Sequence, residues 1–73
     1  MQEKDFLERI GKRIAHYRKE RNMTQMVLSD LTEMEQSALA RIESGKANVT
    51  ALTLLKIARV LKVDPKQFLD FGQ

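Results

Sequence analysis

Residues 24–45 combine polar side chains that can recognise nucleic-acid bases with apolar side chains at helical spacing. The segment is laid out as two short helices joined by a tight turn, and the second helix has one apolar and one polar side. The apolar positions are Leu28, Met34, Leu39 and Ile42. The polar positions are Gln25, Gln36, Ser37 and Arg41. Gln, Ser and Arg carry the hydrogen-bonding groups that read base edges in a DNA major groove, although the same residues could form an ordinary solvated surface.

Side chains suited to enzymatic chemistry are scarce. The chain has no Cys and a single His, His16, and it contains neither a Ser/His/Asp set nor a glycine-rich loop that could hold a phosphate. We therefore expect no enzymatic activity, no metal ion, no cofactor and no small-molecule ligand. Without a disulfide or a metal, a chain of 73 residues must be stabilised by its hydrophobic core.

Charge is distributed unevenly along the chain. Residues 1–22 and 45–73 each carry a net charge of +3, whereas residues 23–44 carry −3. If DNA is bound, the attraction for phosphates must come mostly from the flanks of the acidic central segment.

The apolar periodicity predicts an all-α domain of five helices. The expected helices span residues 4–21, residues 25–32 after the N-cap Thr24, residues 36–44 before Gly45, a stretch capped by Thr50 with a buried stripe over 54–61, and a short helix opened by a capping box at 64–67. Gly11 interrupts the apolar stripe of the first helix, which indicates close packing at that point.

The size and hydropathy of the chain indicate one domain covering residues 1–73, with a helix-turn-helix unit at about 24–45. No apolar run approaches the length of about 18 residues expected of a membrane-spanning helix, and no signal peptide opens the chain. We therefore expect a cytoplasmic protein with no membrane association.

At this point the sequence resembles a known family, the helix-turn-helix domain of lambdoid phage repressors of the Cro type and of Xre-type bacterial regulators. The resemblance covers about residues 10–70 and is carried by IGKRIAHYRKERNMTQ, LARIESGKANVT and LLKIARVLKVDPKQFL. It implies a compact, five-helix fold like that of lambda repressor, with the third helix in the major groove. Two departures are the Glu33 in the turn, where the family often has Gly at positive φ, and the apolar Met26, Val27 and Leu31 where it usually has charge.

The resemblance also implies roles for individual residues. Gln25 is expected to bind a phosphate, and Gln36, Ser37 and Arg41 are expected to face bases. Glu35 is a departure that suits the positive end of the third helix's dipole but repels nearby phosphates, and the alternative is that it accepts a hydrogen bond from cytosine. Lys46 and Asn48 match positions that touch the DNA backbone. The full expected contact set is Gln25, Glu35, Gln36, Ser37, Ala38, Arg41, Ser44, Lys46 and Asn48. Arg18 and Glu43 are expected to form a structural ion pair that makes no contact with DNA.

The sequence thus favours a double-stranded DNA-binding transcriptional regulator, most simply a repressor that binds a two-fold operator as a homodimer. An antitoxin or a restriction–modification controller protein has a similar size and architecture. The rival from another class is a protein-interaction module whose DNA-binding face has decayed, which the acidic central segment and the apolar Met26, Val27 and Leu31 would suit.

The dimer surface is expected in the last helix and the tail, over about residues 63–71. Large apolar residues are concentrated there, and a core this small can bury only one or two of them, which we expect to be Phe68 or Leu69. The expected interface residues are Val63, Phe68, Leu69 and Phe71. Val27 and Leu31, one helical turn apart, form a competing apolar ridge.

Overall fold

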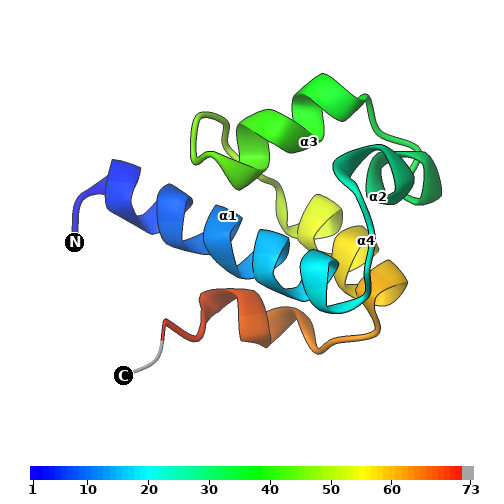
Figure 1. The fold of residues 1–73 in the computed structure, drawn as a ribbon. Coiled ribbons are helices and arrows are strands. Elements are labelled where there is room, and N and C mark those ends of the chain that lie inside the picture. The colour runs from blue at the N-terminus through cyan, green and yellow to red at the C-terminus, as the bar shows by residue number, and fades with distance from the viewer. Residues whose placement is uncertain (72–73) are drawn as a thin grey trace.

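The first helix, α1 (Glu3–Glu20), is the longest element and runs through the middle of the molecule. In the computed structural model, which describes residues 1–71, α1 lies between α3 (Gln36–Glu43) on one side and a C-terminal 3₁₀ helix, η1 (Pro65–Leu69), on the other (Figure 1). Residues 72–73, the last two of the expected domain, lie outside the described residues. The bounds of α1 differ by one residue at each end from those predicted.

Two threonines begin helices as the sequence predicts. Thr24 precedes α2 (Gln25–Leu31), and its side-chain oxygen accepts a hydrogen bond from the backbone N–H of Val27 at 3.1 Å. Thr50 precedes α4 (Ala51–Leu61) and accepts from the N–H of Thr53 at 3.1 Å. Each hydroxyl satisfies a backbone donor that has no partner within its helix.

All four α-helices end in the same way. A residue of positive φ follows the helix, and a pair of backbone hydrogen bonds closes the last turn. After α3, Gly45 has φ of +77°, and the N–H of Lys46 donates to the carbonyl of Arg41 at 2.8 Å. The same pattern after α1, α2 and α4 uses the positive-φ residues Asn22, Glu33 and Lys62. Glu33, at φ of +58°, adopts the conformation expected for the Gly that the family often has there, at a cost that Gly would avoid.

A single hydrophobic core takes side chains from every element. Its buried members are Ile10, Ile14, Leu28, Leu39, Ile42, Ile57, Ala58, Leu61 and Phe68. Met34 and Leu54, which were expected to be buried, pack against this core while remaining partly exposed. The result is a compact all-helical molecule measuring 32 × 22 × 20 Å.

Gly11 brings α1 close to the end of α3, as its place in the apolar stripe predicts. A Cβ atom at this position would lie 2.5 Å from the carbonyl oxygen of Ile42 and nearer still to that of Glu43. Both are backbone atoms that cannot move without shifting α3. The absence of a side chain at Gly11 therefore sets the separation between the two helices.

The prediction of a fifth α-helix is wrong. The described residues form four α-helices, and residues 65–69 form a 3₁₀ helix instead of an α-helix. Asp64 does accept a hydrogen bond, from the N–H of Lys66 at 3.0 Å. The predicted capping box does not form, because the Gln67 side chain accepts a hydrogen bond from the Tyr17 hydroxyl at 3.3 Å. In addition, the Gln67 carbonyl accepts from Arg13 Nε at 3.2 Å. Both of these Gln67 groups therefore bind α1, while its carbonyl also closes the 3₁₀ turn by accepting from the N–H of Asp70 at 3.4 Å.

Among residues 1–71, no helix is long and apolar enough to cross a membrane.

Candidate nucleic-acid interface

The outward side of α3 carries the polar residues expected to face DNA bases. Gln36, Ser37 and Arg41 are exposed, while Leu39 and Ile42 on the opposite side are buried. Because the apolar side is held in the core, α3 cannot rotate about its axis without exposing Leu39 and Ile42. The polar side is therefore presented to solvent in a fixed orientation.

Arg41 is linked to the loop that follows α3. Its guanidinium Nη2 donates to the backbone carbonyl of Lys46 at 3.0 Å, and the N–H of Lys46 donates back to the carbonyl of Arg41 at 2.8 Å. Only one of the five guanidinium N–H groups is used in this way. The side chain is thus directed toward the C-terminal end of α3 with donors still available.

The other members of the expected contact set lie around α3 with different degrees of access. Glu35 is the exposed N-cap residue of α3, but its side chain makes no capping hydrogen bond. Ala38 is half-buried, and the exposed Ser44 donates from its hydroxyl to the Arg41 carbonyl at 3.1 Å. Lys46 and Asn48 are exposed in the loop after α3.

The expected ion pair between Arg18 and Glu43 is present and nearly buried. Arg18 Nε donates to Glu43 Oε2 at 2.8 Å, and Arg18 Nη2 donates to Oε1 at 3.0 Å. The exposed fractions of the two side chains are 10% and 6%. Arg18 Nη1 also donates to the Met23 carbonyl at 2.8 Å, just before α2. One arginine on α1 therefore holds both the end of α3 and the entry to α2.

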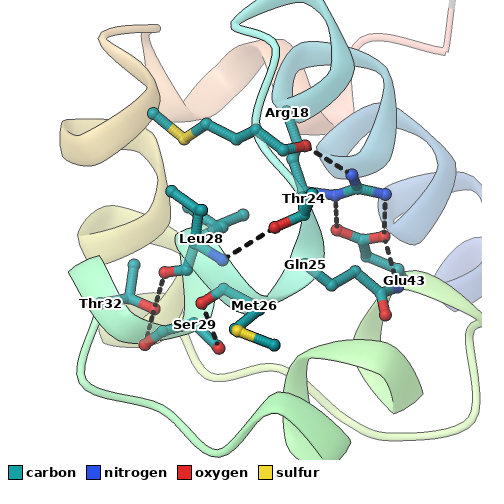
Figure 2. Close-up of polar contacts among 10 residues, drawn as sticks. Arg18, Thr24, Gln25, Met26, Leu28, Ser29, Thr32 and Glu43 are labelled. Atoms are coloured by element: carbon teal, nitrogen blue, oxygen red, sulfur yellow. Dashed lines mark hydrogen bonds and ion pairs between the residues drawn. The ribbon is translucent and has the colours of Figure 1, made fainter.

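Gln25 makes a contact that the sequence did not indicate. Its side-chain Nε2 donates to Glu43 Oε1 at 2.9 Å, so the Gln25 amide and the Arg18 guanidinium converge on one carboxylate (Figure 2). Gln25 is the first residue of α2 and is half-buried. The residue expected to bind a phosphate is therefore attached to the structural ion pair. Spacing alone could not reveal this, because the two residues lie on different helices.

The C-terminal apolar residues do not form the single surface that the sequence suggested. Phe68 is fully buried, so placing it in a dimer interface is a correction, because the core already covers its ring. Phe71 is half-buried against Phe6 of α1, with ring centroids 5.7 Å apart, and Val63 packs against the core. Leu69 remains 47% exposed.

Other exposed apolar side chains lie outside both surfaces that the sequence suggested. An open groove of about 540 Å³ is lined by residues of α1, α4 and η1, including Phe6, Leu54 and Leu69. Phe6 is 42% exposed, and Leu52, beside the groove-lining Ala51, is 73% exposed. Asn48 also lines this groove, so it is shared between the loop after α3 and the apolar surface.

Comparison with known proteins agrees with this geometry. The restriction-modification controller protein C.AhdI from Aeromonas hydrophila has a similar structure, with a TM-score of 0.82 and 27% sequence identity over 85% of this chain and 94% of that one. An HTH_3 family transcriptional regulator from Vibrio cholerae gives a TM-score of 0.85 and 28% identity. The match covers 93% of this chain but only 38% of the Vibrio cholerae chain.

No curated protein sequence gives a significant match. The helix-turn-helix family model, HTH_3, matches residues 14–68, which is more than half of the chain. The chain therefore belongs to the HTH_3 helix-turn-helix family, the group of Xre- and Cro-type proteins that its sequence resembles.

Proposed function

We propose that this protein is a sequence-specific double-stranded DNA-binding transcriptional regulator. The observation that carries the proposal is the exposed face of Gln36, Ser37 and Arg41 on a helix whose opposite side is locked in the core. Membership of the helix-turn-helix family and the similarity to a transcriptional regulator support it. A regulator of this kind acts on DNA in the cytoplasm and needs no catalytic reaction, and we treat residues 1–73 as one functional domain.

The base-reading role belongs to α3 in the major groove. A Gln amide pairs with adenine through two hydrogen bonds, and an Arg guanidinium pairs with guanine in the same two-point manner. We assign these roles to Gln36 and Arg41, with Ser37 as an adaptable donor or acceptor. We assign Glu35 as the acceptor for a cytosine amino group, and we include Ala38 and Ser44 in the proposed contact set.

Backbone contacts would come from the ends of the unit. Gln25, Lys46 and Asn48 are the proposed phosphate-binding residues, and only Lys46 among them carries a positive charge. Glu33, Glu35 and the rest of residues 23–44 give that segment a net charge of −3. Most of the long-range attraction must therefore come from the basic flanks.

The test is a DNA titration with a site selected from a random pool. We expect specific binding whose log affinity falls steeply with log salt, together with much weaker binding of a scrambled duplex of the same composition. Binding that does not distinguish the two duplexes, or that is absent at low salt, would contradict the proposal. The second outcome would favour a protein-interaction module.

We further propose that the functional form is a homodimer that acts as a repressor on a two-fold operator. One helix-turn-helix unit contacts only a few base pairs, so specificity requires a second copy about one helical turn away. The surface that fits this role is the groove lined by Phe6, Leu54 and Leu69, which we call the end patch. Of the interface residues expected from the sequence, the end patch includes Leu69 and leaves out the buried Phe68.

The restriction–modification controller is a narrower candidate within the same class. The observation that favours it is the structural match to C.AhdI, which covers 94% of that protein. Finding that the selected binding site lies upstream of adjacent restriction and methyltransferase genes would support this role. A site upstream of unrelated genes would leave the general regulator role in place and exclude the narrower one.

A further inference from the structure

The Glu43 carboxylate joins three helices through the hydrogen bonds that it accepts. Two come from Arg18 of α1 and one comes from Gln25 of α2, while Glu43 itself ends α3. With its side chain only 6% exposed and held at both oxygens by Arg18, this carboxylate has little freedom to move. It is therefore a rigid reference point for whatever else binds to it.

The hydrogen bond to Glu43 determines the orientation of the Gln25 amide. A primary amide can present either its carbonyl oxygen or its NH₂ group, whereas both a carboxylate and a phosphate only accept hydrogen bonds. Bonding to Glu43 fixes the NH₂ group of Gln25 on one side and rules out the flipped orientation. The nitrogen keeps a second N–H, for which the described residues provide no acceptor.

We propose that Glu43 is a positioning residue for DNA binding, holding the Gln25 amide so that its second N–H donates to a backbone phosphate. This inference rests on the proposed function, since it assumes that DNA is bound through the α2–α3 unit. Glu43 makes no DNA contact of its own. Glu43 already immobilises the Gln25 side chain in the free protein. The side chain therefore loses less conformational entropy when DNA binds.

The role differs from that of a charged phosphate contact in a measurable way. A neutral amide releases no counterion when it binds a phosphate, so Gln25 contributes affinity without contributing to the salt dependence. Lys46, which is exposed and positively charged, should contribute to both. The pair Gln25→Ala and Lys46→Ala is therefore a matched control within one protein.

The test is a double-mutant cycle on affinity for the selected duplex, with Gln25→Ala, Glu43→Gln and the double variant. We expect Gln25→Ala to weaken binding about tenfold with an unchanged salt slope. Glu43→Gln should weaken binding about fivefold when Gln25 is present and less than twofold when Ala replaces it. A merely structural role for Glu43 would weaken binding by the same factor in both backgrounds, and that result would overturn the inference while leaving the proposed function intact.

A second measurement tests the hydrogen bond between Gln25 and Glu43 in the absence of DNA. The two side-chain amide protons of Gln25 should have widely separated NMR shifts in the parent protein and move toward free-glutamine values in Glu43→Gln. Unchanged shifts would overturn the inference. If Glu43→Gln does not fold, Arg18→Lys replaces it, because that change keeps the charge but loses the two-point hold on Glu43. Failure of the parent protein to bind any duplex specifically would overturn both proposals, whatever the amide shifts show.

Discussion

At the scale of single residues, Arg41 offers the most direct test of base reading. Its link to the Lys46 carbonyl directs the guanidinium without using most of its donors. We predict that Arg41→Ala weakens specific binding by about 1–3 kcal/mol and relaxes preference at one base position. Binding-site selection on the variant measures both effects.

Lys46→Ala is the control for that prediction. Loss of a phosphate contact should weaken all sequences alike and lower the salt slope by about one unit, with base preference intact. If Arg41→Ala behaves in the same way as Lys46→Ala, then Arg41 contacts the DNA backbone and α3 does not read bases through it.

Glu43 should also contribute to the free energy of unfolding. Removing it leaves the Arg18 guanidinium nearly buried without its partner, and breaking such a pair costs about 3–5 kcal/mol. Glu20→Ala is the matched control, because Glu20 forms two solvent-accessible pairs, with His16 and with Arg21, and pairs of that kind contribute about 0–1 kcal/mol each. Urea unfolding at low temperature compares the two variants. Equal losses of stability would show that burial of the Arg18–Glu43 pair has no energetic consequence.

At the scale of the elements, the helix ends were the most predictable part of the structure. Thr24 and Thr50 cap helices because a side-chain oxygen near the first turn satisfies local donors, and this depends only on neighbouring residues. Gly45 ends α3 for an equally local reason. The apolar positions of the second and third helices likewise identified Leu28, Leu39 and Ile42 as core, since helical periodicity places them on one side.

The sequence-based prediction was wrong where the outcome depends on contacts distant in sequence. Asp64, Pro65 and Gln67 have the local signature of an α-helix start, but Tyr17 and Arg13 of α1 bind Gln67 and a 3₁₀ helix results. The same limit explains why Phe68 and Leu69 could not be assigned to core or surface. These two adjacent apolar residues take different environments, the core for Phe68 and the surface for Leu69, only once η1 is docked on α1.

The end of α2 offers a prediction at this scale. Glu33 has φ of +58°, a conformation that costs most L-residues about 1–2 kcal/mol and costs Gly far less. We therefore expect Glu33→Gly to raise the free energy of unfolding by about 0.5–1 kcal/mol, after the added flexibility of the unfolded chain is included. Asn22→Gly is the control, since Asn tolerates the same φ better and should gain less. A loss of stability in Glu33→Gly would show that the Glu33 side chain contributes more than its backbone strain costs.

At the scale of the whole molecule, one acidic segment, its two basic flanks and two apolar surfaces are arranged around one core. The α2 ridge of Val27 and Leu31 lies in the acidic segment that also carries the proposed DNA face. The end patch lies instead at the N-terminal end of α1, beside the loop that follows α3. The exposed side of α3 is not part of the end patch, so a second copy bound there can leave both α3 helices free for DNA, although it would lie against Asn48, which lines the groove.

That arrangement leads to the final prediction, which concerns assembly. Placing a charge in a desolvated apolar interface costs several kcal/mol, so Leu69→Asp should shift the parent dimer to monomer at micromolar concentration. Leu31→Asp is the matched control, because Leu31 is exposed to a similar extent, 56% against 47%, but lies on the α2 ridge. Sedimentation of the two variants, each checked for helical content, decides between the surfaces. Dissociation by Leu31→Asp alone would move the interface to α2, and a parent protein that sediments as a monomer, or two variants that both remain dimeric, would exclude the end patch altogether.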